Sequence, residues 1–495
     1  MSAGKVSRRR FLWESAVAAA AAVLAACQPK VIEKTIEVPK TVEVEKVIQV
    51  TPTPVRDVLS LPNAATGIPY QIKASVNGGK PIRLTMWEWT PERVDYEKRW
   101  CQEYQALYPN VTIEITTVAA FGDYFAKLIT NIPAKQGPTL FHMHLNNLAT
   151  FCEGGFMDPM PSYVADQAFL DSHWAGYKEG LFNCPGTGTR HFVPMGGQMP
   201  VLFINRGLWN EAGLTETDIP KSWEDLRRVA KALTKYDKSG RIVQAGFQAQ
   251  WMRLMFCGLY QQGRYLFTSD HRRAQLDNEE ARKVLQFILD LYKVDKVFDP
   301  EFPEGSTSFT SGQTAMFMSE SYYAAMIRKA APNMDWFGVL VPTVSGGLPP
   351  AVGRKHFAVD MAVNSQATNE EKEVAWDFWH FAYSSDERLA RDLSIGQGMV
   401  PAYDKLLEHP AVKADPFAAA IAPGFDYGVP IGELPVAWET CVSNAINAVL
   451  LGEASISDAL AKAEAEMEIE LAKRQRWGIL ERNYKHGDLM IPNQP

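Results

Sequence analysis

The sequence predicts an α/β fold with at least two lobes, and three observations support this. The chain has 495 residues, well above the roughly 150 residues of a typical single domain. Its 46% hydrophobic and 22% charged residues are ordinary for a globular protein. From residue 83 onward, extended and helical patterns alternate, and units of strand, helix and strand produce parallel sheets.

The patterns predict these elements in order: strand 83–87, helix 94–107, strand 111–115, helix 123–131, strand 139–144, helix 148–152, strand 200–205 and helix 223–233. Pro109 ends the first helix, and Ser222 followed by Asp225 predicts an N-terminal cap for the last one. In such sheets, ligands gather outside the carboxyl ends of the strands.

The first 26 residues are expected to be an export signal rather than part of the fold. The basic segment Ser7-Arg8-Arg9-Arg10-Phe11-Leu12-Trp13 precedes an alanine-rich run at 16–26, which is too short to span a bilayer. The basic segment resembles a twin-arginine signal, and Leu24-Ala25-Ala26-Cys27 resembles a lipobox. We therefore expect an exported lipoprotein that is anchored through acylated Cys27 to the extracytoplasmic face of the cell membrane.

Residues 27–79 are expected to be a low-complexity tether. The unit Thr35-Ile36-Glu37-Val38 recurs as Thr41-Val42-Glu43-Val44, and a proline-rich segment at 51–54 follows. Alternating β-branched and charged residues favour an extended chain.

Charge and motifs exclude several classes of function. The net charge is −7, and because the leader is basic, the remaining chain is more negative still, which argues against a nucleic-acid binder. The sequence contains no G-x-S-x-G, no H-E-x-x-H and no Walker-type glycine loop. No cofactor is expected.

Five cysteines remain after Cys27, namely Cys101, Cys152, Cys184, Cys257 and Cys441. Their odd number and the lack of a C-x-x-C pattern indicate neither a disulfide framework nor a zinc site. At most two bridges are possible, and mostly buried free thiols are expected. Which cysteines pair, if any, stays open.

Three blocks of sequence resemble a known family. They are Phe192–Pro194 with Val201–Arg206, Leu208–Leu214 and Pro220–Leu226; Phe309–Met318 with Trp336–Pro342; and Ala375–Trp379 with Gly396–Pro401. Together with the closing helical stretch 454–471, they resemble the extracellular solute-binding proteins of family 1 in ABC importers, which include maltose-type binding proteins. The resemblance covers roughly residues 80–475.

The resemblance implies a two-lobed, type II periplasmic-binding-protein-like fold, with hinge-linked lobes that close on a ligand. We expect residues 80–195 and 313–347 to form one lobe, and 196–312 and 348–485 to form the other. It also implies a monomer that captures an extracytoplasmic solute and delivers it to ABC permease subunits, without catalysis.

A sugar site needs aromatic platforms for C–H faces and planar polar groups for hydroxyls. Trp87 and Trp89 follow the first strand, and Asn146 and Asn147 follow the strand that ends at His144. The resemblance adds further candidates for ligand binding, namely Trp251, Glu320, Tyr322, Tyr323, Gln397, Met399 and Trp438. For the tryptophans and asparagines, an ordinary core or capping role stays open.

His142 and His144 alternate on one strand and therefore face the same side. Because no third ligand is close in sequence, no metal site is expected.

An aromatic content of 11%, with 13 Trp, favours a sugar or oligosaccharide as the solute. A glycerol phosphate ester, a peptide or a polyamine remains an alternative ligand. A secreted carbohydrate hydrolase would need two carboxylates, for which Glu320 with Asp360 or Glu439 are candidates. A surface adhesion lipoprotein is a third possibility.

Overall fold

The structure, a computed structural model, describes residues 70–473 and the strands at 484–486 and 489–491, with gaps at 119, 166, 175–181, 185–186, 195, 269–271, 347–352, 359, 426 and 431–437. The predicted export signal, Cys27 and the tether up to residue 69 lie outside the described residues.

The first sheet has the strand order β11-β3-β1-β2. Its strands are β1 (Ile82–Glu88), β2 (Val111–Thr117), β3 (Leu140–Met143) and β11 (Asp360–Val363). β1 runs parallel to β2 and β3, whereas β11 runs antiparallel to β3. The carboxyl ends of β1, β2 and β3 therefore meet at one edge, as the alternation of strands and helices predicts.

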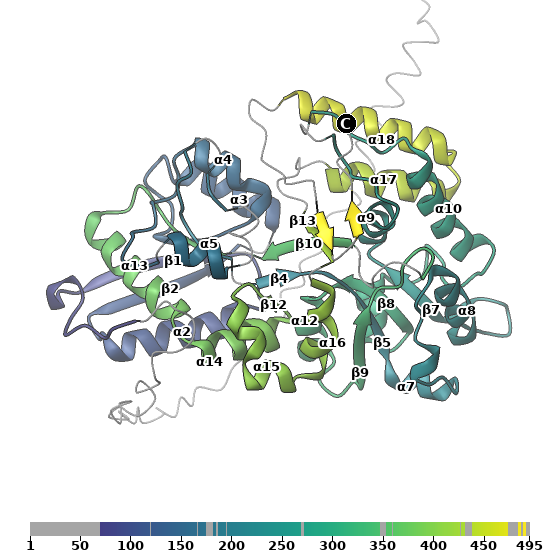
Figure 1. Cartoon of the computed structure of the whole chain (residues 1–495), viewed down its shortest axis with the longest axis horizontal. Coiled ribbons are helices and arrows are strands. Elements are labelled where there is room, and N and C mark those ends of the chain that lie inside the picture. The colour runs from purple at the N-terminus through teal and green to yellow at the C-terminus, as the bar shows by residue number, and fades with distance from the viewer. Residues whose placement is uncertain are drawn as a thin grey trace, which may run out of the picture. The chain divides into compact units, whose positions relative to one another are not determined.

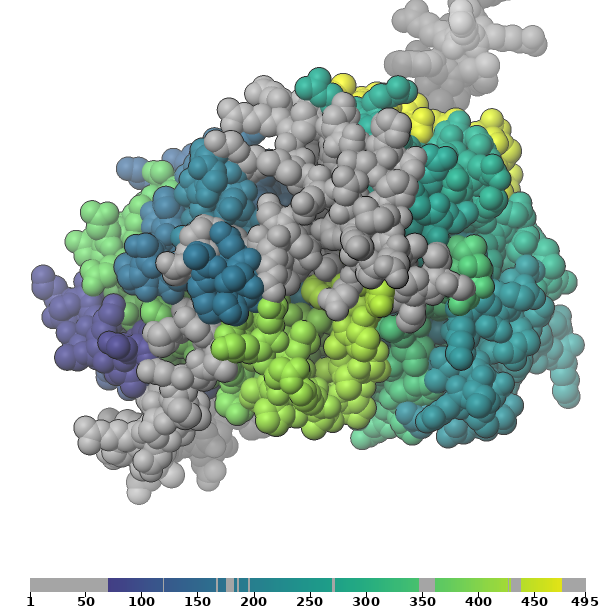
Figure 2. Space-filling model, viewed as in Figure 1, coloured from purple at the N-terminus to yellow at the C-terminus, as the bar shows by residue number. Residues whose placement is uncertain are grey.

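Helices pack against this sheet in one hydrophobic core. They include α2 (Val94–Leu107), α3 (Phe121–Asn131), α4 (Leu148–Glu153), α5 (Gln167–His173) and α13 (Asn369–Tyr383). The predicted helix 94–107 is confirmed at both ends. Although α13 comes late in the sequence, its green residues lie beside the purple and blue residues of the first sheet (Figure 2), because Trp376 and Trp379 are buried in the same core.

The second sheet has the strand order β6-β7-β8-β5-β9. Its strands are β5 (Pro200–Asn205), β6 (Lys235–Tyr236), β7 (Ile242–Ala249), β8 (Thr314–Glu320) and β9 (Trp336–Leu340). Every residue of β5 and β8 is buried. Because side chains alternate along a strand, Leu202 and Ile204 enter one hydrophobic core while Val201 and Phe203 enter the other.

One face of the second sheet is covered by α7 (Arg206–Glu211), α8 (Trp223–Leu233), α9 (Trp251–Gln261), α10 (Glu279–Lys293), α17 (Trp438–Leu451) and α18 (Ile456–Ala472). The other face packs on α11 (Gly305–Thr310), α12 (Tyr323–Ala330) and α16 (Pro416–Phe425). The predicted strand 200–205 and helix 223–233 are confirmed at both ends. Ser222 and Asp225 form the reciprocal capping bonds of α8.

A third sheet, with the order β12-β4-β10-β13, connects the first two. It contains β4 (Gly196–Gln198), β10 (Gly353–Ala358), β12 (Val400–Pro401) and β13 (Gly428–Pro430). β4 runs on into β5, and β10 runs on into β11, so the chain crosses twice between the first and second sheets (Figure 1). We call β4–β5 and β10–β11 the crossover segments.

The crossover segments pair antiparallel, with Gln198 opposite His356 and Gly196 opposite Ala358. On its other side β4 pairs with β12, and Gly196 allows that approach, because a Cβ atom there would lie 2.9 Å from the carbonyl oxygen of Val400.

The strand pairing corrects the predicted division of the chain. The sequence places residues 313–347 with 80–195, but β8 pairs with β5 and β7, and β9 pairs with β5. Both strands therefore belong to the second sheet. Conversely, β11 and α13 are predicted to join 196–312, yet they complete the first sheet and its core. A family motif identifies a segment, but its hydrophobic pattern does not specify which sheet it enters.

Cys152 in α4 forms a disulfide with Cys184. Cys101, Cys257 and Cys441 are free and buried. The free thiols agree with the sequence analysis, whereas the bridge was not indicated by any spacing pattern. Disulfides are typical of exported proteins. Among the described residues, none of the helices has the length and hydrophobicity needed to cross a membrane.

Replacing both Cys152 and Cys184 with Ser should lower the free energy of unfolding by about 3–4 kcal/mol, because the bridge restricts the unfolded chain across a separation of 32 residues. Urea unfolding under non-reducing conditions measures this loss. A reductant should destabilise the wild-type protein by a similar amount and leave the double variant unchanged. Equal stability of the two proteins would contradict the prediction.

Candidate functional site

The carboxyl ends of β1 and β2 present an aromatic surface. Trp89 follows β1, and its ring centroid lies 4.9 Å from that of Tyr124 and 5.4 Å from that of Phe125. Phe121, at the start of α3, lies 5.5 Å from Trp89 and 5.0 Å from His144 between ring centroids. Trp89, Phe121 and His144 are therefore neighbours, and we call them the aromatic set.

Sequence reasoning missed Phe121, although its side chain is 39% exposed. The available signal was its position directly after the second strand of a parallel sheet. Trp87, in contrast, is half-buried against the first core, and its carbonyl oxygen accepts a hydrogen bond of 2.9 Å from the Tyr124 hydroxyl.

The two asparagines after β3 differ in their surroundings. Asn147 is buried at the start of α4. The backbone N–H of Asn146 donates to Nδ1 of His144 at 3.2 Å. The Oδ1 atom of Asn146 is buried and has no hydrogen-bond partner among the described residues. Asn146 thus adds an available acceptor beside the aromatic set.

A second group of side chains comes from the second sheet and its helices. Arg253, on α9, places Nη2 3.6 Å from Oε2 of Glu320 and Nη1 3.2 Å from Oε1 of Glu439. Gln250 donates from Nε2 to the Tyr322 hydroxyl at 3.2 Å. We call Gln250, Arg253, Glu320, Tyr322 and Glu439 the polar set.

Burial shifts the protonation equilibria of the polar set. Burial raises the pKa of Glu320, with Arg253 opposing and Glu439 adding to the effect. Burial also raises the pKa of Tyr322, so its hydroxyl stays protonated at neutral pH. Within the described part of the chain, Oε1 of Gln250 and Nε of Arg253 have no hydrogen-bond partner. The polar set therefore offers both donors and acceptors.

The crossover segments bring the two sets toward each other. Glu320, at the end of β8, pairs with Pro200 at the start of β5. Met143, next to His144, pairs with Asp360 at the start of β11. Because β4 and β10 pair antiparallel, these two strand ends lie at opposite ends of the same paired segment. Burial together with the charges of Arg93 and Arg253 lowers the pKa of His144 to about 3, which places Arg253 within electrostatic range of the aromatic set.

Several predicted site residues lie in the cores instead. Tyr323 is buried, and its hydroxyl donates to the backbone oxygen of Ser306. Trp438 is buried, with its ring centroid 3.9 Å from that of Phe256. Trp251 packs against Phe298 at 4.4 Å between ring centroids. These contacts bring none of the three into the aromatic set or the polar set.

The glycine-rich segment before β12 is also buried. Gln397 donates from Nε2 to the backbone oxygen of Glu92 at 3.3 Å, and Met399 packs in the first core beside Gly196. Both side chains therefore contact residues that belong to neither the aromatic set nor the polar set.

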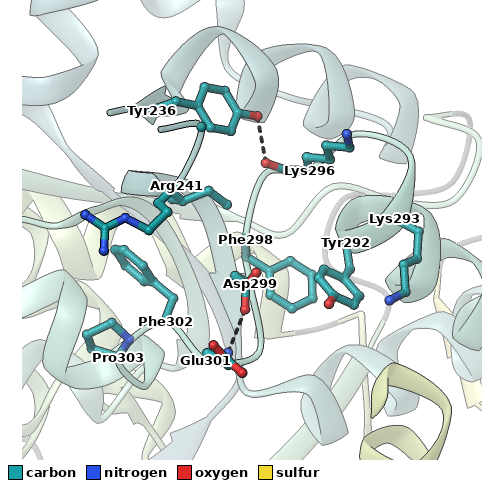
Figure 3. Close-up of a pocket in the computed structure, with 12 residues that line it drawn as sticks. Tyr236, Arg241, Tyr292, Lys293, Lys296, Phe298, Asp299, Glu301, Phe302 and Pro303 are labelled. Carbon is teal, nitrogen blue, oxygen red and sulfur yellow. Dashed lines mark hydrogen bonds between the residues drawn. The ribbon is translucent and has the colours of Figure 1, made fainter. Parts of the chain in front are cut away.

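A separate pocket of about 610 Å³ lies beside the second sheet, between β6, the start of β7 and the loop that follows α10 (Figure 3). Figure 3 shows Phe302 beside Arg241 on one side of the pocket and Lys293 beside Tyr292 on the other. The residues that line it include none of the candidates from the sequence. This pocket is an alternative position for a ligand, and substitution of a residue that lines it would distinguish it from the two sets.

Glu88, Glu97 and His142 place one possible metal-ligating atom each within 4.8 Å of one another. However, Nη1 of Arg93 lies 3.9 Å from Oε2 of Glu88. With the imidazole protonated, two positive charges already balance the two carboxylates, so a proton fits this arrangement better than a divalent cation.

Comparison with known proteins reveals one family and several relatives. The family described as bacterial extracellular solute-binding protein matches residues 90–388. A lipoprotein of Streptomyces antibioticus is 22% identical over 349 residues, which cover 68% of this chain and 74% of the relative. A maltotriose-binding protein of Pyrococcus abyssi is 21% identical over 331 residues, which cover 66% of this chain and 67% of the relative.

Solved structures share the fold. A maltose/maltodextrin-binding domain from Bdellovibrio bacteriovorus, bound to maltotriose, has a TM-score of 0.67 and 16% identity, and covers 79% of this chain and 100% of its own. An ABC transporter solute-binding protein from Thermotoga lettingae, bound to α-D-tagatose, has a TM-score of 0.64 and 21% identity, and covers 79% of this chain and 99% of its own. These likenesses agree with the two-lobed fold that the sequence predicts.

Proposed function

Because the chain belongs to the bacterial extracellular solute-binding proteins, we propose that it captures an uncharged sugar or oligosaccharide and delivers it to an ABC permease. The observation that supports this proposal is that the aromatic set and the polar set border the two ends of the paired crossover segments. Aromatic rings pack on the C–H faces of sugars, while amide, guanidinium and carboxylate groups bond the hydroxyls.

The charges of the two sets favour an uncharged ligand. Arg253 faces two carboxylates, Glu320 and Glu439, and burial raises the pKa of Glu320, which favours its neutral form. His144 is neutral at physiological pH, since its pKa is lowered to about 3. A glycerol phosphate ester would meet no surplus of positive charge in these two sets, so they disfavour an anionic ligand. The relatives described with maltotriose or tagatose support the same ligand class.

Closure about the crossover segments would complete the site. The aromatic set lies at the edge of the first sheet, and the polar set belongs to the second sheet and its helices. Small backbone rotations at β4–β5 and β10–β11 would move one group toward the other. A ligand that touches both groups stabilises the closed form, and no covalent step is required of this monomeric chain.

We further propose that the chain is exported and lipid-anchored. The Leu24-Ala25-Ala26-Cys27 segment supports acylation of Cys27, and the lipoprotein relative and the Cys152–Cys184 disulfide support an extracytoplasmic location. Of the predicted tether 27–79, residues 27–69 would then link the anchor to the fold, because Tyr70 bonds to Asp377 and Val76 is buried in the first core.

A labelled fatty acid fed to expressing bacteria should be incorporated into the wild-type chain and not into Cys27→Ser, because only Cys27 lies in the lipobox-like segment. Fractionation should place the wild-type chain with membranes. Label retained by Cys27→Ser would contradict anchoring at this residue.

Thermal unfolding against sugars, glycerol phosphates, peptides and polyamines should show stabilisation by one saccharide class. A ligand at about 100 times its Kd adds roughly 2.7 kcal/mol of stability. The sugar mixtures should be unchanged afterwards. Stabilisation only by a charged class of compound would contradict the proposal of a saccharide ligand. Cleavage products would instead support a hydrolase that uses Glu320 and Glu439.

Trp89→Ala and Tyr322→Ala should each raise the Kd for that saccharide by roughly three- to tenfold, the effect expected from one stacked aromatic ring. Isothermal titration calorimetry measures the change, and circular dichroism checks the fold. Phe302→Ala is the matched control, because Phe302 lines the separate pocket. If binding weakens in Phe302→Ala and in neither of the other two variants, the ligand binds in that pocket instead.

A further inference from the structure

Four charged or ionisable side chains are buried together beneath the aromatic set. They are Glu88 at the end of β1, Arg93 before α2, Glu97 in α2 and His142 in β3, and none is more than 4% exposed. Nε2 of His142 lies 2.8 Å from Oε1 of Glu97 and 3.2 Å from Oε2 of Glu88. We call these four residues the buried ionic cluster.

The cluster holds the backbone and ring of Trp89. Oε1 of Glu88 accepts hydrogen bonds of 2.7 Å from the backbone N–H groups of both Trp89 and Thr90. The guanidinium carbon of Arg93 lies 5.6 Å from the centre of the Trp89 ring. The His142 ring lies 6.5 Å from the same indole. The cluster therefore holds the Trp89 backbone and borders one side of its ring, which also packs on Tyr124 and Phe125.

The carboxylates of the cluster are balanced only when its imidazole is protonated. Arg93 always carries a positive charge. Burial alone would lower the pKa of His142, but Glu88 and Glu97 outweigh it and raise this pKa above its ordinary value. Burial would raise the pKa of Glu97, but His142 and Arg93 outweigh it and lower this pKa. The cluster thus favours the protonated form of His142 and the ionised form of Glu97.

Glu88 is the member whose charge changes near neutrality. Burial raises its pKa to about 7, with His142 and Arg93 opposing and Glu97 adding to the effect. An ionised carboxylate accepts stronger hydrogen bonds than a protonated one. The bonds from Glu88 to Trp89 and Thr90 should therefore strengthen as pH rises through 7.

The other titratable groups around the cluster keep one charge state in this range. Burial raises the pKa of Tyr96 and Cys101 on α2 and of Tyr124 on α3, so all three stay neutral. His144, after β3, stays neutral because its pKa is lowered to about 3. Tyr383, on α13, contributes electrostatically to Tyr96. Within the cluster, Glu88 is the carboxyl group that accepts the hydrogen bonds of the Trp89 and Thr90 backbone, so a change in its charge acts on them directly.

We propose that the buried ionic cluster positions Trp89 for ligand binding and that ionisation of Glu88 tightens this position, so that ligand affinity rises from pH 6 to pH 8. The proposal rests on the proposed function, since Trp89 is assigned there to the saccharide site. Glu88 and His142 act as positioning residues, because they reach the ligand only through Trp89.

Hydrogen exchange tests the positioning without any ligand. After correction for the intrinsic effect of pH on exchange, the segment containing Trp89 and Thr90 should be more protected at pH 8 than at pH 6 in the full chain. Glu88→Gln should remove this difference, because an amide oxygen accepts a hydrogen bond but does not ionise. Glu114→Gln is the control, since Glu114 is an exposed carboxylate on neighbouring β2 that pairs with Arg83.

Calorimetric titration with maltotriose, or with the saccharide found by thermal unfolding, tests the effect on binding. Affinity should rise by up to about tenfold between pH 6 and pH 8, as the ionised fraction of Glu88 rises. Glu88→Gln should flatten this profile, whereas Glu114→Gln should keep it. A slope that persists in Glu88→Gln and disappears in Glu320→Gln would assign the pH effect to the polar set and overturn the proposal.

The two experiments separate the proposal from the function on which it rests. If no saccharide binds at any pH, the proposed function fails, whereas the exchange data still test the cluster. Protection of Trp89 and Thr90 that does not change with pH would overturn the proposal, even if sugars bind. The proposal would also be overturned if the protein retained one equivalent of zinc or manganese through dialysis and lost it in Glu97→Gln, because a cation would then replace the proton.

Discussion

The site depends on the antiparallel pairing of the two crossover segments. Buried backbone groups need hydrogen-bond partners, and β4 and β10 supply them to each other as the chain passes between the sheets. This pairing fixes the end of β8 relative to the end of β3 through the junctions at Pro200 and Asp360. Glu320 and His144, which are distant in sequence, come from these two strand ends. The same backbone geometry can therefore both assemble the site and allow it to close.

The two chemistries of a sugar site come from different sheets. The aromatic set follows strands of the first sheet, whose carboxyl ends meet at one edge. The polar set uses the end of β8 and the starts of α9 and α17. In the proposed site, the aromatic set supplies ring faces from the first sheet, while the polar set supplies hydrogen-bonding groups and the Tyr322 ring from the second. This division links ligand binding to the relative position of the two sheets.

The sequence predicted local structure better than it predicted contacts. Periodicity and caps gave α2, β5 and α8 correctly, because these signals depend on neighbouring residues. The local pattern also placed Trp89 directly after the first strand. It did not show that β8 enters the second sheet or that Cys152 meets Cys184, since both depend on segments far apart in the chain. Trp251 became a candidate through the family resemblance, which carried no information that its ring packs on Phe298.

The charged side chains around the site point to an uncharged solute. Glu88 and Glu97 are compensated by His142 and Arg93. Arg253 offsets one negative charge of Glu320 and Glu439, and burial favours the neutral form of Glu320. Removing a charge from water is costly unless a partner replaces the lost hydration, and here the protein supplies each partner itself. A charged solute would disturb this balance or remain poorly compensated. A neutral sugar needs only hydrogen-bonding atoms and ring faces, which are the features that Asn146, Gln250, Arg253 and the aromatic set provide.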